Sequence, residues 1–129
     1  MPCPPNTVLA HVPGWDTATV RRLLATLGLV PILHFGDLDP AGVGIVAHLK
    51  TQVPHLRWFV PACWSGYVAS HGQARDWPAV VVPSDAPRLV QELAAAGLWL
   101  EQEVVVLDPR FEGELVVEID GGGGTGLLP

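Results

Sequence analysis

Two aspartates one residue apart, Asp37 and Asp39, are the side chains best suited to chemistry in this sequence. They follow an apolar segment with a strand pattern and precede one with a helix pattern. If the backbone between them is extended, side chains two residues apart point to the same side, and the carboxylates come close together. Such a pair of like charges favours a cation between them, and its oxygen ligands suit Mg²⁺ or Mn²⁺. The spacing therefore predicts a divalent-metal site.

The surroundings of the pair also favour a ligand site. In open α/β sheets, ligands bind outside the carboxyl ends of the strands, where these aspartates are expected. Gly36 and Gly42 would let the backbone turn tightly and a ligand approach closely. The structural alternative is that Asp37 makes an Asx turn and Asp39 caps the next helix. The complete string Gly-Asp-Leu-Asp-Pro-Ala-Gly is more specific than Asp-x-Asp alone and favours the metal site.

The first half of the chain alternates between strand and helix patterns. The predicted strands, which are apolar or β-rich, cover 7–12, 29–35 and 56–60. Apolar residues at helical spacing predict two intervening helices. The first is expected to be capped by Asp16 and to stop at Gly28, and the second to start at Pro40 and reach Lys50. Connections of this length fit right-handed crossovers, so the sequence predicts an α/β fold with a parallel sheet.

The second half is less regular. Its predicted segments are a packed loop over 61–77, a strand over 79–82, a helix capped by Ser84 or Asp85 and ended by Gly97, and a strand over 114–119. The run 99–107 begins with a strand-like alternation and ends apolar. The predicted domain spans 7–120, between a disordered segment over 1–6 and a flexible Gly-rich tail over 121–129.

The composition is that of one soluble domain. The chain has 129 residues, of which 49% are hydrophobic, enough to fill a single core. No apolar run approaches the ~20 residues of a membrane helix, and the first residues do not resemble a signal peptide. Cys3 and Cys63 lack metal-ligand spacing and are expected to be free thiols. We therefore expect a cytoplasmic protein without a membrane partner.

The net charge argues against a domain that grips nucleic acid by itself. Acidic residues number 13 and basic residues 7, which gives a formal charge of -6 and none of the basic excess that such proteins use. A bound metal would neutralise part of the acidic charge, and a partner chain or a further domain could supply a basic groove. DNA binding with such help stays open, as does a homo-oligomer.

The string Phe-Gly-Asp-Leu-Asp-Pro-Ala-Gly-Val-Gly-Ile at 35–45 resembles the metal-binding motif of toprim domains. The nearest versions are those of the JetD-type nuclease subunit of Wadjet plasmid-defence systems and of the A subunit of type IIB topoisomerases. The string Leu-Glu-Gln-Glu at 100–103 is similar to one that follows the toprim core in JetD-like proteins. The resemblance covers roughly residues 8–106, as motifs in the same order.

The resemblance implies a toprim-like, mainly parallel sheet of about four strands flanked by helices. It also implies that Asp37 and Asp39 bind Mg²⁺ for breaking or joining phosphodiester bonds, as in nucleases and topoisomerases. The partner implied by this chemistry is DNA.

One part of the toprim pattern is missing. Toprim domains begin with a strand that ends in a glutamate, the proposed general acid or base, whereas the first acidic residue here is Asp16. The resemblance therefore implies either a fragment of a longer protein or a reduced toprim-like domain, and it argues against topoisomerase activity by this chain alone. Glu101 and Glu103 are the best internal substitutes, provided that their segment is a strand, because residues two apart then share a face. Otherwise they form a solvated edge.

Several other side chains are expected to be structural. His34 is predicted to be a packed core histidine, because Mg²⁺ sites prefer oxygen donors. Trp64, Tyr67 and Trp77 could stack on bases, but Arg75 is the only basic residue near them in the sequence. We therefore expect these aromatic residues in the core or at an interface.

Three functions follow from these residues. The first is a toprim-like Mg²⁺-binding domain of a nucleic-acid-processing protein, with phosphodiester cleavage only if a third acid completes the site. The second is a non-catalytic toprim-fold domain for assembly or interaction, which the acidic charge and the missing glutamate favour. A phosphoryl site at Asp37, as in response regulators, is weaker because no nucleophile-plus-lysine pattern accompanies it.

Overall fold

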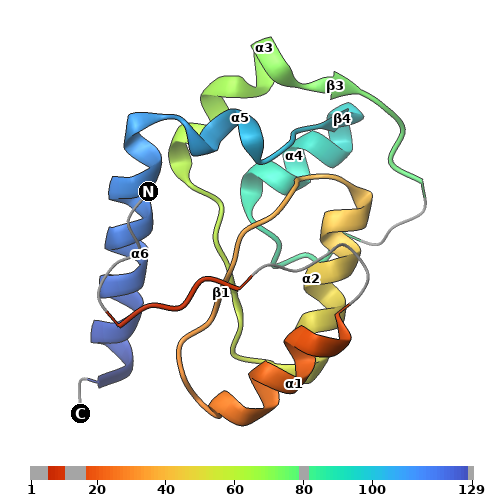
Figure 1. The fold of residues 1–129 in the computed structure, drawn as a ribbon. Helices are drawn as coiled ribbons and strands as arrows, with labels where there is room; N and C mark the ends of the chain where they lie inside the picture. The colour runs from red at the N-terminus through yellow and green to blue at the C-terminus, as the bar shows by residue number, and fades with distance from the viewer. Residues whose placement is uncertain (1–5, 11–16, 79–81, 128–129) are drawn as a thin grey trace.

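The structure is a computed structural model that describes residues 6–10, 17–78 and 82–127. It combines helices with short strands (Figure 1). Two long helices, α2 (Pro40–Gln52) and α6 (Pro109–Leu127), lie on opposite sides of strand β1 (Leu33–His34). The short elements between residues 62 and 106 gather at one end of the molecule, where β1 leads into α2, whereas the helix over 18–27 lies at the other end. No helix in these three ranges is long and apolar enough to cross a bilayer.

The parallel pairing expected around α2 is present in shortened form. Strand β1 pairs in parallel with β2 (Arg57–Trp58), and α2 forms the crossover between them. The Phe59 amide donates to the His34 carbonyl at 2.8 Å, which extends the pairing at the end of the ladder. Leu29 is exposed and lies outside the strand. The strand expected over 29–35 therefore begins only after Pro31, which has no amide proton to donate to a ladder.

The second sheet is antiparallel and small. Strand β3 (Gln73–Ala74) pairs with β4 (Leu98–Trp99), and one further bridge joins Leu38 to Leu100. The described residues thus form two sheets of two strands each. A mainly parallel sheet of about four strands is not seen in them, although the mixture of helices and strands is.

The helix ends predicted from glycine agree with the structure, whereas the predicted side-chain caps of the helix after residue 87 do not. Helix α1 (Ala18–Leu27) ends at Gly28 and α4 (Arg88–Ala96) ends at Gly97, both with positive φ, as predicted. The expected cap Asp16 lies outside the described residues. The predicted caps Ser84 and Asp85 are wrong, because Pro87 precedes α4 and provides no side-chain cap.

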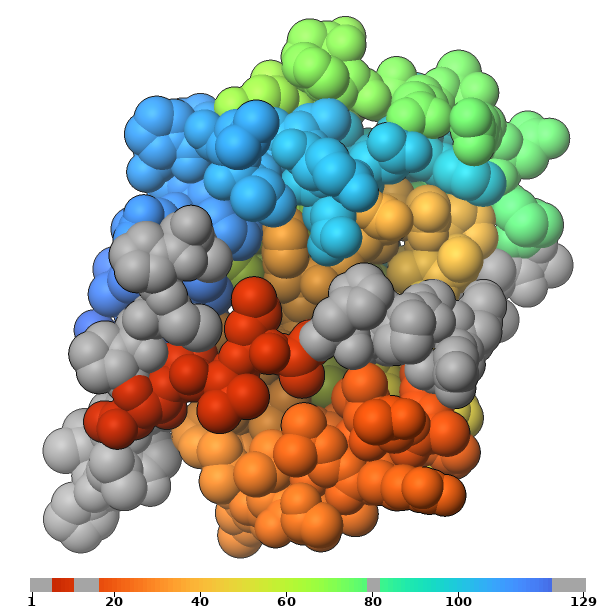
Figure 2. Space-filling model, viewed as in Figure 1, coloured from red at the N-terminus to blue at the C-terminus, as the bar shows by residue number. Residues whose placement is uncertain are grey.

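Three segments differ from their predicted structure. Residues 7–10 form no strand, and Val8 and Leu9 are 84% and 82% exposed. Figure 2 shows residues 6–10, in red, lying across the surface. The segment 61–77, expected as a loop, holds η1 (Ala62–Tyr67), α3 (Val68–His71) and β3. Residues 11–12 and 79–81, parts of two predicted strands, lie outside the described ranges.

The strand expected over 114–119 belongs to α6 instead. Phe111 is buried and Leu115 packs on the core, one helical turn apart, whereas Val117 is exposed. The segment therefore buries one face of a helix. The alternation of polar and apolar residues in its sequence, which predicted a strand, is misleading here. The predicted boundary at residue 120 between the domain and a flexible tail stays a prediction.

Two clusters form the core. A larger one lies among η1, α4, β4, α5 (Glu103–Val106) and the start of α6, and a smaller one lies under α2. Phe35, directly after β1, contacts Trp64 and Phe111 with ring centroids 5.3 and 5.0 Å apart. These aromatic rings join the end of β1 to η1 and α6. The prediction that Trp64 is a core residue is confirmed.

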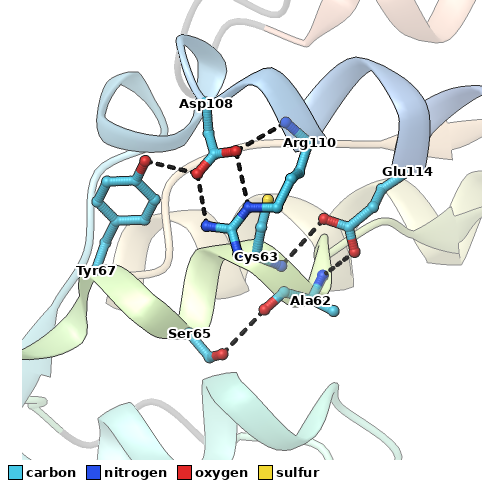
Figure 3. A network of polar contacts seen from close by, with 7 residues as sticks. All are labelled: Ala62, Cys63, Ser65, Tyr67, Asp108, Arg110 and Glu114. Carbon is cyan, nitrogen blue, oxygen red and sulfur yellow. Dashed lines mark hydrogen bonds and ion pairs between the residues drawn. The ribbon is translucent and has the colours of Figure 1, made fainter.

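Polar contacts fix α6 to η1 (Figure 3). The Tyr67 hydroxyl donates to Asp108 at 2.7 Å, and the Arg110 guanidinium donates to both oxygens of the same carboxylate. Arg110 and then Tyr67 hold the pKa of Asp108 well below its usual range. The amides of Ala62 and Cys63 donate to the Glu114 carboxylate at 2.8 and 3.0 Å. This network links η1 to the start of α6.

The same network raises the pKa of two side chains that can act as nucleophiles, those of Cys63 and Tyr67. Burial, followed by the bond and charge of Glu114, raises the pKa of the Cys63 thiol to about 12. The bond to Asp108 raises the pKa of Tyr67. Cys63 is a free thiol, as predicted. Cys63 therefore stays protonated at neutral pH, and neither residue is placed as a nucleophile.

The bridge between Leu38 and Leu100 provides a test of this fold. We expect Leu100→Ala to lower the free energy of unfolding by about 2–5 kcal/mol, because Leu100 is 0% exposed and its removal leaves a cavity. Leu107, in the same apolar run, is 89% exposed and supplies the control. Leu107→Ala should change the value by less than about 0.5 kcal/mol. Urea denaturation measures both, and equal losses in the two variants would contradict the fold.

Candidate functional site

Asp37 lies three residues after the end of β1 and is hydrogen-bonded to a distant turn. Its Oδ1 accepts a hydrogen bond of 2.8 Å from the Gln102 amide, 65 residues further along the chain. The side chain is half-buried. The expected Asx turn is not what holds it. A long-range bond fixes Asp37 against the turn between β4 and α5.

Asp39 caps α2, as the structural alternative predicted. Its backbone is extended, and its Oδ1 accepts from the Gly42 amide at 2.7 Å. Pro40 occupies the first helical turn, where its missing amide proton costs nothing. The motif thus folds locally as its sequence predicts, with a capped helix that starts after a short turn from the strand.

The Leu38/Leu100 bridge sets where the aspartates point. Leu38 donates to Leu100 at 2.9 Å and accepts from it at 3.1 Å, and both side chains are completely buried. In an antiparallel ladder, the residues before and after a paired residue point to the opposite side of the sheet from the paired residue itself. Asp37 and Asp39 therefore point to the opposite face from the core. Across the bridge, Asp37 lies opposite Glu101 and Asp39 opposite Trp99.

Glu101 and Glu103 enter this site in different ways. Glu101 ends the extended segment and is exposed, whereas Glu103 is the first residue of α5. The two glutamates were expected to share a face only if one strand contained both, and no strand does. Both still act on Asp37, whose pKa is raised first by burial and then by the charges of Asp39, Glu103 and Glu101. The Gln102 amide opposes this rise by hydrogen bonding to the carboxylate.

The carboxylates do not form a complete metal cage. Within the described ranges, no three His, Cys, Asp or Glu side chains are grouped to hold an ion. Each aspartate nevertheless uses only Oδ1 in its hydrogen bond, and Oδ2 makes none with the residues described. Mg²⁺ is typically held by one or two carboxylates, with water and substrate phosphates completing its shell. The two Oδ2 atoms are thus the ligands that this face offers.

Gly42 lets α2 pack against the acidic turn. A Cβ at this position would lie 2.0 Å from the Asp37 carbonyl oxygen, far closer than any contact between these atoms allows. The predicted need for glycine at 42 is therefore explained by close approach of the chain to itself. Gly36 has a milder requirement, since its Cβ would lie 3.0 Å from Nε2 of His34.

The structural role expected of His34 stays a prediction. Its side chain is half-buried in β1, and burial lowers its pKa to about 4. At neutral pH it is therefore uncharged and adds no positive charge beside the carboxylates.

Several contributors to this site have no signal in the sequence. Leu100 and Gln102 matter through their backbone amides and carbonyls, which any residue type could supply. Trp99 was visible only as part of a strand-like alternation. Its position opposite Asp39 depends on pairing between distant segments.

The comparisons with known proteins leave the family open. No family model, no curated protein and no solved structure matches this chain. The resemblance to toprim domains therefore depends on the two motifs alone.

A glycine substitution tests the packing of the acidic turn. We expect Gly42→Ala to destabilise the protein by roughly 1–3 kcal/mol, because the added Cβ forces α2 away from Asp37. Gly113→Ala is the control, since a Cβ there meets nothing within 4 Å and alanine favours a helix by about 1 kcal/mol. Thermal unfolding should move the two variants in opposite directions. A stabilised Gly42→Ala variant would contradict the close approach.

The burial of His34 predicts a pH dependence of stability. Between pH 6.5 and about 4, unfolded chains bind a proton at His34 that folded molecules do not. Protonation of His34 in the unfolded chain lowers the free energy of unfolding as the pH falls through this range, by at most about 3 kcal/mol. It has no effect above pH 6.5. In His34→Leu this part of the pH dependence should disappear. Urea unfolding of both proteins across this window measures it, and parallel curves would exclude the effect.

Proposed function

We propose that the chain is a toprim-like Mg²⁺-binding domain of a nucleic-acid-processing protein, acting on phosphodiester bonds. The observation that carries this proposal is the common face of Asp37 and Asp39. Both follow β1, both point away from the core beside the Leu38/Leu100 bridge, and each has one oxygen without a hydrogen bond to a described residue. The parallel pair β1 and β2 with its crossover helix is compatible with a larger toprim-like sheet of about four strands.

The proposed ion is Mg²⁺ or Mn²⁺, bound through Oδ2 of Asp37 and of Asp39. When bound, it would offset the mutual repulsion of the carboxylates and stabilise charge on a phosphate. Metal binding requires only these two residues. Cleavage requires a third acid, for which Glu101, opposite Asp37, is the better placed candidate than Glu103 in α5. A catalytic role for either glutamate remains part of the proposal.

The proposed substrate is DNA, bound in the cytoplasm with the help of a basic partner chain or domain. The formal charge of -6 gives this chain little attraction for phosphates by itself. A divalent metal would neutralise the charges of the two aspartates where a phosphate must approach.

Asparagine substitutions separate the metal-binding role from the structural role. Asp37→Asn keeps an oxygen that can accept from Gln102, and Asp39→Asn keeps a good helix cap, but both remove the charge. We expect Mn²⁺ to broaden the amide NMR signals of residues 36–42 and of Gln102 in the wild type. Both variants should keep the folded spectrum and lose the broadening.

Asp120→Asn, an exposed aspartate on α6, is the matched control and should keep the broadening. If Mn²⁺ leaves the signals of residues 36–42 and Gln102 sharp, the metal site is excluded. Unselective broadening over the acidic surface, unchanged in Asp37→Asn, would exclude it equally.

A second function, a non-catalytic toprim-fold domain for assembly, is favoured by a different observation. Val8, Leu9 and Leu29 are all more than four-fifths exposed, although large apolar side chains are usually buried. Such side chains are available to a second copy of the chain or to another protein. This function predicts self-association or partner binding that does not change in Asp37→Asn.

A further inference from the structure

We propose that Arg75 and Trp99 form a binding platform for an unpaired nucleotide of single-stranded nucleic acid, next to the candidate metal site. The proposal rests on the proposed function and specifies its substrate. It adds a base-stacking residue and a phosphate-binding residue to the two aspartates.

The register of three neighbouring segments places the platform beside the carboxylates. Strand β4 pairs with β3 through Trp99 and Gln73 on one edge, and Leu100 pairs with Leu38 on the other. Leu98 and Leu100 pack into the core, so Trp99 between them points to the opposite face. That face carries Asp37 and Asp39 on one segment, Trp99 and Glu101 on the next, and Gln73 on the third. Neighbouring strands are about 4.8 Å apart.

Trp99 does not serve the core. Among the tryptophans at described positions, Trp64 is completely buried, and Trp58 and Trp77 pack on a core cluster. Trp99 packs on neither cluster and is partly exposed. Its Nε1 donates to the Asp76 carbonyl at 3.2 Å, which fixes the orientation of the ring. An oriented and partly exposed indole is suited to stacking on a base.

Arg75 adds an unneutralised positive charge to this ring. Its guanidinium carbon lies 5.0 Å from the centre of the Trp99 ring, a cation–π contact. Three other arginines, Arg57, Arg88 and Arg110, form ion pairs, but Arg75 forms none with any carboxylate at a described position. The side chain is exposed. It is therefore available to a phosphate, which a planar guanidinium can bind through two hydrogen bonds.

The spacing fits a short stretch of nucleotide chain. Arg75 follows β3, two strand spacings or about 10 Å from the segment that carries Asp39. Because the Arg75 guanidinium lies over one face of the Trp99 ring, a base would stack on the other face, with the proposed metal beside it. In a duplex the faces of each base are already stacked, so an aromatic platform prefers an unpaired base. The platform therefore selects a single strand or a frayed end.

Fluorescence anisotropy with labelled oligo-dT in Mg²⁺ buffer tests the platform. We expect saturable binding that is about tenfold weaker in Trp99→Leu and nearly retained in Trp99→Phe, because phenylalanine still stacks. Oligo-U is the second probe, and binding of either strand through Trp99 supports the platform and tells whether DNA or RNA is preferred. Wild-type binding that is absent, equal for duplex, or unchanged in Trp99→Leu would overturn the proposal.

Salt dependence tests Arg75 separately. A lost phosphate contact should reduce the slope of log K against log salt by about 0.7 in Arg75→Gln. Arg88→Gln, an exposed arginine on α4, is the control and should keep the slope. An unchanged slope in Arg75→Gln would overturn its role. If Trp99→Leu fails to fold, Arg75→Gln carries the test, and an unchanged slope then overturns the platform.

The Mn²⁺ experiment keeps this proposal distinct from the proposed function. If Mn²⁺ broadens residues 36–42 but oligonucleotides do not bind through Trp99, only the platform is wrong. If oligonucleotides bind through Trp99 but Mn²⁺ causes no broadening, the platform stands without a metal site.

Discussion

Two hydrogen bonds between Leu38 and Leu100 hold together the segments on which the site depends. The bridge holds the two segments side by side, and the Gln102 amide donates to Asp37 between the same segments. Both leucines are completely buried, so water does not compete for these bonds. Since pleating alternates the direction of side chains, burying the leucines turns the polar neighbours outward. One apolar contact thus sets the direction of the polar face.

The two aspartates also show how one residue can serve the fold and a ligand together. Each carboxylate gives one oxygen to a backbone amide, which fixes its position, and keeps the other available. The repulsion around Asp37 is the electrostatic cost of gathering these acids. A carboxylate held by the backbone needs little reordering when a cation arrives, and this lowers the entropic cost of binding.

The parts of the structure that the sequence predicted are those determined locally. Gly28, Gly97, Pro40 and the Asp39 cap act within one helical turn, and all four predictions were confirmed. Pairing between distant segments has no comparable local signal. The bridge at Leu38, the helical state of residues 114–119 and the exposure of residues 8–10 all depend on what packs against them. Of the candidate site, the aspartates and Glu101 could be named from the sequence, but the pairing that places Glu101 and Trp99 opposite them could not.

The contact between Glu114 and the start of η1 has a consequence for the order of events during synthesis. The amides of Ala62 and Cys63 find their acceptor 52 and 51 residues further along the chain. Because a ribosome adds about 5–20 residues each second, these donors wait several seconds before the carboxylate exists. Until then the first turn of η1 has two amides without this acceptor. In a nascent chain, the hydrogen bonds at the first turn of η1 are therefore completed only after the start of α6 has been synthesised.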